Sequence, residues 1–333
     1  MNKITNTKIL VTGGAGFIGS NLCEALLSQG NQVVCLDNFS TGFRKNIEPF
    51  LSNEKFTLIE GDIRNYEDCQ RGVKGCDYVF HEAALGSVPR SMKDPMTSTD
   101  VNIGGFVKML FAAKEEGVKR FVYAASSSTY GDHPDLPKVE DIIGNPLSPY
   151  AITKYADELF AKNFSDIYGI ETVGLRYFNV FGRRQDPKGA YAAVIPKFVI
   201  SLMKHKKPVI NGDGSYSRDF TYIDNVIQAN QLAALTPPEK LYNEKTGKSQ
   251  VFNVAYAERT NLNELVEILK EYLSYFDPEV KSIEPAHGSN REGDIPHSLA
   301  SIQKAKDLMD YAPQYSVKKG LKEAVKWYWE NLK

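Results

Sequence analysis

Three glycines near the amino terminus restrict the fold more than any other feature of the sequence. Gly13, Gly16 and Gly19 give the spacing GxxGxxG in the run TGGAGFIGS. An apolar run at residues 9–11 precedes them, and a helical pattern of apolar residues at 22–27 follows. This order predicts a strand, a tight turn and a helix. In such a turn the glycines let the backbone approach a pyrophosphate at the positive end of the helix dipole.

The next apolar run supports a dinucleotide site. Residues 33–36 form this run, and Asp37 follows it about 20 residues beyond the glycine turn. A carboxylate at this place accepts hydrogen bonds from a ribose 2'-hydroxyl and repels a 2'-phosphate. We therefore predict NAD rather than NADP as the cofactor. The alternative is that Asp37 only caps the turn after the strand.

Strand-like runs alternate with helical patterns through the first half of the chain. These runs lie at residues 33–36, 57–59, 78–80, 121–124 and 172–177. The alternation predicts the α/β class, with a Rossmann-type doubly wound parallel sheet. Ligands of such sheets lie beyond the carboxyl ends of the strands. The residues that directly follow the runs are therefore candidates for the site, and they include Asp62, Ile63, Ala83, Ala84, Ser126 and Asn179.

The alternation loosens beyond Asn179, where segments rich in Gly, Pro and Asn lead to an aromatic helical tail. We predict a NAD-binding Rossmann domain at residues 1–178 and a smaller mixed α/β substrate domain at residues 179–333. The chain can also cross between the domains, so that some segments of the second range belong to the first domain.

A tyrosine and a lysine four residues apart indicate the chemistry. Tyr150 and Lys154 lie in the run SPYAITKY, in an amphipathic helical pattern that follows Pro149. A free tyrosine has a pKa of about 10, and ionising it near pH 7 requires roughly 4 kcal/mol of preference for the phenolate. An ammonium at about 4 Å supplies energy of this order at an effective dielectric constant of about 20. A tyrosine and a lysine at this spacing also occur commonly by chance on solvated helix faces. The pair therefore indicates this chemistry only in combination with the glycine turn.

Composition excludes several other classes of protein. The 333 residues are 42% hydrophobic and contain no apolar run near the ~20 residues that a membrane span requires. The opening residues MNKITNTK are polar and lack the hydrophobic segment of a signal peptide, which predicts a cytoplasmic protein. The four cysteines lack CxxC or zinc-ligand spacing, and the five histidines form no metal-binding cluster. A formal net charge of -1 without a sustained basic block argues against nucleic acid as a partner.

Longer motifs occur in order along nearly the whole chain. They are TGGAGFIGS, GDIR, HEAA, SSSTYG, SPYxxxK, LRYFNVFG, SRDFTYIDN and REGDIPHS. This set resembles the extended short-chain dehydrogenase/reductase family, and within it the UDP-sugar 4-epimerases. The stretches GSVPRS, AASSSTYGDHP and NVFGRRQDPKGAYAAVIPK are similar to those of the UDP-N-acetylglucosamine 4-epimerases of bacterial surface-polysaccharide pathways.

The resemblance implies a NAD-dependent inversion at C4 of the sugar through a transient 4-keto sugar. Tyr150 would take the proton of the 4'-hydroxyl while C4' gives a hydride to NAD, and the hydride would then return to the opposite face. Lys154 would tune Tyr150 and hold the nicotinamide ribose. Ser126 would place its hydroxyl on the sugar oxygen and act as a proton bridge. The alternative is that this serine, which follows a strand, only caps the next turn.

The resemblance also implies where the two ligands bind. Arginine suits a diphosphate because its planar donors contact two oxygens at once. The residues expected at the UDP-sugar are Ser87, Ser126, Ser127, Tyr150, Asn179, Arg218, Arg291, Asp294 and Ser298. Those expected at NAD are Gly13, Gly16, Phe17, Ile18, Gly19, Asp37, Asn38, Asp62, Ile63, Ala83, Ala84 and Lys154.

Ser298 bears on which sugar is bound. Epimerases restricted to glucose and galactose resemble this chain but have a bulky tyrosine at the position of Ser298. The small serine leaves space for a 2-acetamido group, which predicts UDP-GlcNAc and UDP-GalNAc as substrates, with UDP-glucose and UDP-galactose as further candidates. The alternative is that Ser298 caps the helix expected at residues 302–309.

Three alternative functions share parts of the pattern. The 4,6-dehydratases and UDP-glucuronate decarboxylases of the family need an acidic residue before YG, where this chain has Ser127 and Ser128. Net reductases generally bind NADPH, which Asp37 disfavours. A non-catalytic NAD-binding protein would keep the fold without the chemistry. The intact serine, tyrosine and lysine of the catalytic set favour an enzyme.

The resemblance further implies a homodimer. Two helices from each subunit would join it, around residues 95–116 and 150–168. Their apolar stripes also suit packing in an ordinary core, so periodicity alone leaves the oligomeric state open.

Overall fold

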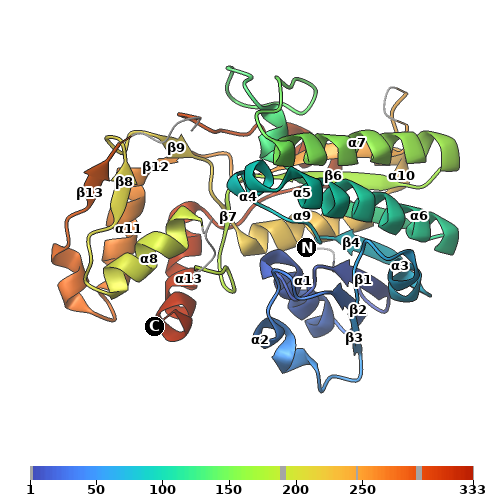
Figure 1. Ribbon diagram of the computed structural model, residues 1–333, viewed down its shortest axis with the longest axis horizontal. Helices are drawn as coiled ribbons and strands as arrows, with labels where there is room; N and C mark the ends of the chain where they lie inside the picture. The colour runs from blue at the N-terminus through green and yellow to red at the C-terminus, as the bar shows by residue number, and fades with distance from the viewer. Residues whose placement is uncertain (1–2, 188–192, 245–246, 290–294, 333) are drawn as a thin grey trace.

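A parallel sheet of seven strands forms the centre of the protein (Figure 1). The computed structural model describes residues 3–187, 193–244, 247–289 and 295–332. The strand order is β11-β6-β5-β4-β1-β2-β3, so the chain reverses its direction of progress between β1 and β4. The predicted fold class, a doubly wound parallel sheet, is confirmed. The strands are β1 (Lys8–Thr12), β2 (Gln32–Asp37), β3 (Phe56–Glu60), β4 (Tyr78–His81), β5 (Arg120–Ser126), β6 (Thr172–Tyr177) and β11 (Ser249–Val254).

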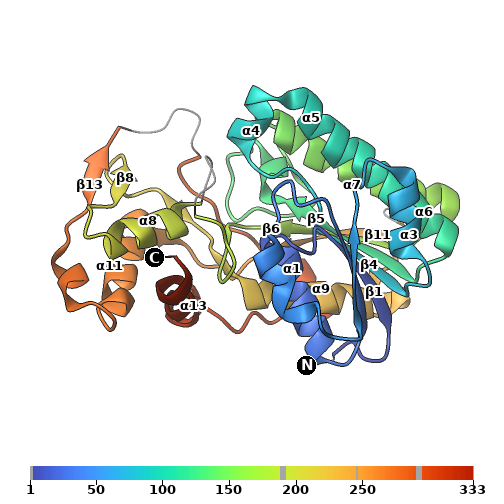
Figure 2. The ribbon, with the colours of Figure 1, turned by 60° about the horizontal axis from the view of Figure 1, so that its bottom comes forward.

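The two faces of the sheet bury separate hydrophobic cores, because successive side chains of a strand point to opposite faces. Phe121 and Tyr123 of β5 belong to the core beneath α3, α6 and α7, whereas Val122 between them belongs to the core that includes α1 and α9. Figures 1 and 2 show these two helical layers on either side of the sheet. The helices are α1 (Phe17–Ser28), α3 (Tyr66–Val73), α6 (Phe106–Glu116), α7 (Pro149–Tyr168) and α9 (Ile223–Leu235).

Short helical segments connect the strands at the edge that carries the site. A π-helical turn, η2, joins α5 to α6, so the helix expected around residues 95–116 is made of three pieces. The segments are α2 (Arg44–Ile47), η1 (Glu48–Phe50), α4 (Val88–Lys93), α5 (Pro95–Thr99), η2 (Asp100–Gly105) and η3 (Ser127–Tyr130).

A second lobe lies beside the sheet, at the left of Figures 1 and 2. Its helices α8 (Val194–Met203), α11 (Leu262–Leu273) and α13 (Val317–Asn331) pack on one another, and their buried residues continue the core of α1 and α9. Three short two-stranded sheets complete it: β7 (Val180–Phe181) with β10 (Thr221–Tyr222), β8 (Val209–Asn211) with β13 (Ala286–Gly288), and β9 (Ser217–Arg218) with β12 (Thr260–Asn261). Of the remaining short segments, η4 (Pro278–Ser282) packs on α11, whereas α12 (Gln303–Met309) packs on β11 of the central sheet and contacts α10 (Pro238–Leu241). Figure 1 shows α10 at the right, beside the central sheet.

Part of the range 179–333 returns to the central sheet. Strand β11 pairs in parallel with β6, from Ser249 beside Thr172 to Val254 beside Tyr177. Helix α9 packs against β5, β6 and β11. A single boundary at residue 178 therefore separates the two lobes only in part, because the sheet takes its last strand and the helices α9 and α12 from beyond that point.

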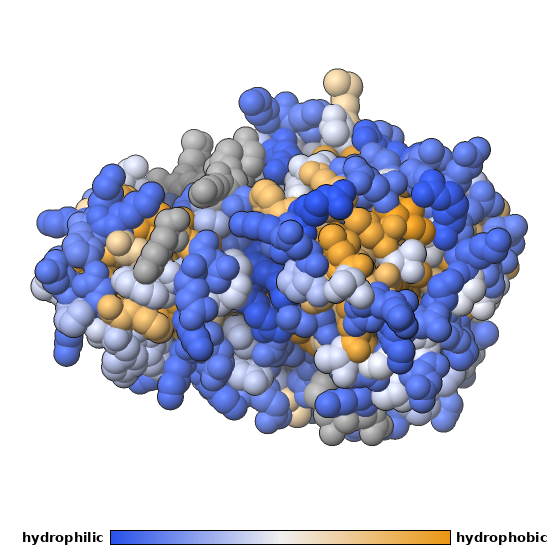
Figure 3. Space-filling model, turned by 90° about the horizontal axis from the view of Figure 1, so that it is seen from below, coloured by the Kyte–Doolittle hydropathy of each residue, from blue (hydrophilic) through white to orange (hydrophobic). Residues whose placement is uncertain are grey.

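The molecular surface seen from below is largely hydrophilic (Figure 3). Hydrophobic side chains gather in the right half of that view, on the side of the central sheet, while the second lobe on the left carries fewer of them. Among the described residues, no helix is both long enough and apolar enough to cross a membrane.

Candidate active site

The glycine turn joins β1 to α1 through contacts that larger residues could not make. Gly13 has a φ of +65°, and a Cβ at this position would lie 2.8 Å from the backbone nitrogen of Ala83. A Cβ on Gly19 would lie 2.2 Å from the carbonyl oxygen of Gly13. Helix α1 begins immediately after Gly16. The turn therefore provides the close backbone approach and the helix amino terminus that a pyrophosphate requires.

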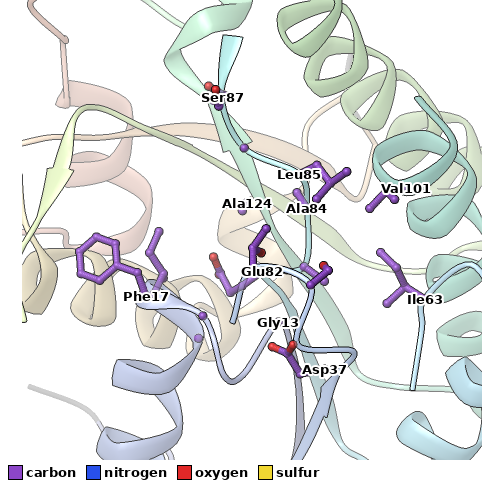
Figure 4. Close-up of a pocket in the computed structure, with 18 of the residues that line it drawn as sticks. Gly13, Phe17, Asp37, Ile63, Glu82, Ala84, Leu85, Ser87, Val101 and Ala124 are labelled. Atoms are coloured by element: carbon purple, nitrogen blue, oxygen red, sulfur yellow. The ribbon is translucent and has the colours of Figure 1, made fainter. Parts of the chain in front are cut away.

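A cavity of about 520 Å³ opens beyond the carboxyl ends of β1, β2, β4 and β5 (Figure 4). Figure 4 shows Glu82 in its middle, Phe17 on one side, and Ile63 and Val101 on the other. Every residue expected at the cofactor lines this cavity: Gly13, Gly16, Phe17, Ile18, Gly19, Asp37, Asn38, Asp62, Ile63, Ala83, Ala84 and Lys154. The position agrees with the rule that ligands of open α/β sheets bind where the strand order reverses.

Asp37 ends β2 and is held by two backbone amides. Its Oδ2 accepts a hydrogen bond of 2.9 Å from the amide of Ala15, and its Oδ1 accepts one of 2.8 Å from the amide of Phe39. Burial raises the pKa of Asp37, while these two amides oppose the rise. The carboxylate therefore caps the turn, as the alternative proposed, and also lines the cavity where the ribose is expected.

Asn38 and Asp62, which follow β2 and β3, come together at the rim of the cavity. The side-chain amide of Asn38 donates a hydrogen bond of 2.9 Å to Asp62. The guanidinium of Arg64 donates to the same carboxylate at 2.7 Å. The hydrogen bond from Arg64 is the main reason that the pKa of Asp62 falls to about 2. This carboxylate is therefore ionised at any pH near neutrality.

Helix α7 positions the tyrosine and lysine as the sequence predicts. Pro149 occupies its first turn, and the Ser148 side chain caps it by accepting a hydrogen bond of 3.2 Å from the amide of Ala151. Tyr150 and Lys154 both line the cavity. The ammonium of Lys154 is buried and donates a hydrogen bond of 2.9 Å to the carbonyl of Ala124.

Ser126 ends β5 and begins the η3 turn. Its Oγ accepts hydrogen bonds from the amide of Ser128 at 3.1 Å and from the hydroxyl of Ser128 at 2.9 Å. The serine therefore caps the next turn, as the alternative for this residue proposed. Both bonds use the oxygen as acceptor, so the Ser126 hydroxyl hydrogen remains to be donated into the cavity that the residue lines.

A second cavity, of about 980 Å³, adjoins the first at Ser126, which lines both. It lies between the central sheet and the second lobe. Of the residues expected at the substrate it contains Ser126, Ser127, Asn179, Arg218 and Ser298. Ser87 and Tyr150 line the first cavity instead. Arg291 and Asp294 lie outside the described residues.

Ser298 does not cap a helix. Helix α12 begins at Gln303 with Ile302 at its cap position, and the side chain that accepts a hydrogen bond from the amide of Gln303 is Ser301, at 3.4 Å. The amide of Ser298 instead donates a hydrogen bond of 3.0 Å to the carbonyl of Ser217, the residue of β9 that precedes Arg218. The capping alternative for Ser298 is therefore wrong, and the residue lines the second cavity.

Glu82 and Tyr177 form part of the site but are absent from the predicted set. The Tyr177 hydroxyl donates a hydrogen bond of 2.8 Å to Glu82, and both side chains line the first cavity. The motifs HEAA and LRYFNVFG contain these residues. The sequence carries no local signal for their contact, because they are 95 positions apart.

These features are those of a dinucleotide-dependent enzyme with a Rossmann-type fold. They are the parallel sheet, the glycine turn where the strand order reverses, and the tyrosine and lysine beside it. The chain belongs to the NAD dependent epimerase/dehydratase family, whose family model matches residues 9–255. This membership confirms the predicted cofactor, NAD.

Relatives with different sugars in their names cover almost the whole chain. A putative UDP-glucose 4-epimerase from Methanocaldococcus jannaschii is 35% identical, over 97% of this chain and 99% of that protein. A UDP-glucuronate 4-epimerase from Thermodesulfobacterium geofontis is 32% identical, over 97% and 96%. The structure of a UDP-N-acetylglucosamine 4-epimerase from Methanobrevibacter ruminantium M1, in complex with UDP-N-acetylmuramic acid, is 38% identical. It has a TM-score of 0.88 and covers 98% of this chain and 99% of its own.

Proposed function

We propose that this protein is a UDP-sugar 4-epimerase that interconverts UDP-GlcNAc and UDP-GalNAc through a transient 4-keto sugar. The observation that carries the proposal is the junction of the two cavities. Ser126 lines both, and Tyr150 and Lys154 lie in the wall of the first. A sugar in the second cavity would thus meet the acid–base group and the cofactor at one place.

Each catalytic side chain has a role that its position supports. NAD, when bound, supplies an acceptor for the hydride of C4' and returns it. Tyr150 takes the proton of the 4'-hydroxyl as a phenolate and gives it back after the hydride returns. Lys154 stabilises the phenolate by its charge, and Ser126 donates its hydroxyl hydrogen to the sugar oxygen.

The second cavity supports binding of the nucleotide sugar. Arg218 and Asn179 line it. Arg218 and Arg291 are proposed to bind the UDP diphosphate, with Asn179 on the phosphate or sugar side and Asp294 near the uridine ribose. Ser87 caps α4 with its side chain and is proposed to lie near the sugar, at the border of the first cavity.

The N-acetylated sugar is proposed from the size of Ser298. Its small side chain lines the wall of the substrate cavity, where a tyrosine ring would fill space needed by a 2-acetamido group. The name of the Methanobrevibacter relative agrees with this sugar, while the names of the other relatives point to glucose and glucuronate.

Dehydration and decarboxylation are less well supported. Both need an acidic residue where Ser127 and Ser128 line the second cavity. An NAD-binding protein without activity is disfavoured by the presence of Ser126, Tyr150 and Lys154 together in one cavity.

A homodimer is proposed through the face formed by α5 and α7, which pack side by side. Met96, Ile152, Leu159 and Ile167 on these helices are exposed although they are large and apolar. Sedimentation of the wild type and of Leu159→Lys tests the proposal. We expect the wild type at twice the mass of the variant, and a wild-type monomer would contradict the proposal.

The function is tested by incubating the purified protein with UDP-GlcNAc, UDP-GalNAc, UDP-glucose and UDP-glucuronate, each with and without added NAD. We expect inversion at C4, measured by NMR, to be fastest for the two N-acetylated sugars. Release of a 4-keto-6-deoxy sugar or of carbon dioxide would favour the dehydratase or decarboxylase. No reaction with any UDP-sugar would contradict an epimerase.

A further inference from the structure

Asp157 lies one helical turn beyond Lys154, on the same side of α7. Its side chain is fully buried, and its Oδ2 is 3.3 Å from the Lys154 ammonium. Its Oδ1 has no hydrogen-bond partner within the described part of the chain. Burial of a carboxyl group without full hydrogen bonding is costly, so a residue of this kind at this place requires a reason.

Asp157 is the carboxyl group in direct contact with Lys154 among the charged groups around it. Burial raises the pKa of Asp157 to about 7, and the charge and hydrogen bond of Lys154 oppose the rise. His81 on β4 is neutral, because burial lowers its pKa to about 3. Glu82, after β4, is bonded to Tyr177 on β6 and has its pKa raised to about 7 by burial. Glu158, the next residue of α7, is bonded at both oxygens to Arg176 on β6.

Without an anion, the site would favour a neutral amine at Lys154. Burial acts to lower the pKa of Lys154. Asp157 acts most strongly to raise it, Tyr150 and Glu82 add to this effect, and the resulting pKa is raised. Tyr123 of β5 also faces the pair, but its own buried phenol stays protonated because burial raises its pKa well above the ordinary value. The positive charge of Lys154, which stabilises a phenolate at Tyr150, therefore depends on Asp157.

We propose that Asp157 is a positioning residue that keeps Lys154 charged and fixed on the helix face of Tyr150, through the 3.3 Å ion pair between them. This inference rests on the proposed function, in which Tyr150 is the acid–base group. Asp157 acts through Lys154. When Asp157 loses its charge, Lys154 loses the anion that holds its proton, and the phenolate of Tyr150 loses its cation.

The test is Asp157→Asn, which keeps the size of the side chain and removes its charge. Ionisation of Tyr150 is followed in the purified protein by the near-ultraviolet absorbance of the phenolate. Subtracting the titration of the same protein with Tyr150→Phe isolates this residue. We expect Asp157→Asn to ionise Tyr150 at a pH at least about one unit higher, which is roughly a tenfold smaller phenolate fraction near neutrality.

The rate should follow the titration. We expect the acidic limb of the pH profile of kcat/KM to move upward by a similar amount, so activity is reduced most at low pH and recovers as the pH rises. An unchanged or lower midpoint for Tyr150 in Asp157→Asn would overturn the inference. Asp157→Ser, a smaller uncharged variant, gives the same comparison if Asp157→Asn folds poorly.

Glu158→Gln is the matched control, because it removes the charge of the adjacent buried acid without a contact to Lys154. We expect it to lower the melting temperature but to leave the ionisation of Tyr150 unchanged. A shift as large as that of Asp157→Asn would mean that any buried charge on this helix has the same effect, which contradicts a specific role. The titration needs no substrate. An absence of epimerase activity in the wild type would therefore count against the proposed function, and an unshifted titration in Asp157→Asn against this inference.

Discussion

The phenol of Tyr177 donates a hydrogen bond of 2.8 Å to Glu82, whose other carboxyl oxygen is buried in the wall of the first cavity without a partner in the described residues. Burial raises the pKa of Glu82 from its ordinary value near 4.5 to about 7, although Tyr177 and Lys154 oppose the rise. The folded protein therefore holds a proton between about pH 4.5 and 7 that the unfolded chain has released. Over this range Glu82 makes the free energy of unfolding fall as the pH rises.

Glu82→Gln should remove this contribution, because glutamine cannot ionise and still accepts the hydrogen bond from Tyr177. We expect the variant and the wild type to have similar stability at pH 5. At pH 8 the free energy of unfolding of the variant should exceed that of the wild type by up to about 3 kcal/mol, because the contribution of Glu82 changes by roughly 1.4 kcal/mol per pH unit. Denaturant unfolding at both pH values measures the difference. A difference that is the same at pH 5 and pH 8 would show that Glu82 does not titrate in this range.

Gly19→Ala should damage the cofactor site. The added Cβ would lie 2.2 Å from the carbonyl oxygen of Gly13, and neither backbone segment can move without opening the turn. We expect a loss of about 1–3 kcal/mol of stability and at least tenfold weaker NAD binding, measured by calorimetry. Gly104→Ala is the control, because its Cβ would have an ordinary contact at 3.4 Å. Normal NAD binding by Gly19→Ala would contradict the role of the turn.

The choice between NAD and NADP should depend on the charge of Asp37. We expect the wild type to bind NAD at least tenfold more tightly than NADP, since the carboxylate repels a 2'-phosphate. Asp37→Asn should reduce this preference for NAD over NADP, whereas Asn38→Ala, which changes no charge, should leave the preference unchanged. Binding constants for both cofactors provide the measurement. An equal ratio in the wild type and in Asp37→Asn would argue that the residue serves only to cap the turn.

Ser298→Tyr should act selectively on the N-acetylated sugars. A ring in the wall of the substrate cavity removes space next to the sugar, so we expect kcat/KM for UDP-GlcNAc to fall at least tenfold more than that for UDP-glucose. Ser298→Ala keeps the space and should keep the preference. Equal losses for the two sugars in Ser298→Tyr would contradict the explanation by size.

Local patterns predicted most of the sheet and of the cofactor site. The run expected at residues 172–177 coincides with β6, and the run at 33–36 lies within β2. The glycine turn and the start of α7 at Pro149 could also be predicted from the sequence, because each depends on residues close together in the chain. The predicted cofactor residues meet in one cavity because the carboxyl ends of parallel strands share one edge of the sheet.

Features that depend on distant contacts were not predicted. Strand β11 joins β6 across more than 70 residues, and its sequence alone does not distinguish the central sheet from the second lobe. The burial of Asp157 could not be inferred either, since an aspartate within an amphipathic helix is ordinarily solvated. The helix expected at residues 302–309 begins at Gln303, so its distance from Ser298 excluded the cap that residue type alone favoured.

The central claim is that Tyr150 exchanges a proton with the sugar while C4 is inverted. Its most direct measurement is the NMR signal of C4 inversion for UDP-GlcNAc, recorded with the wild type and with Tyr150→Phe at equal content of bound NAD. We expect the wild type to reach an equilibrium mixture of UDP-GlcNAc and UDP-GalNAc. The folded variant should lose at least a factor of about 10³ in rate, in the range of general acid–base catalysis. Inversion by Tyr150→Phe at a rate near that of the wild type would contradict the account.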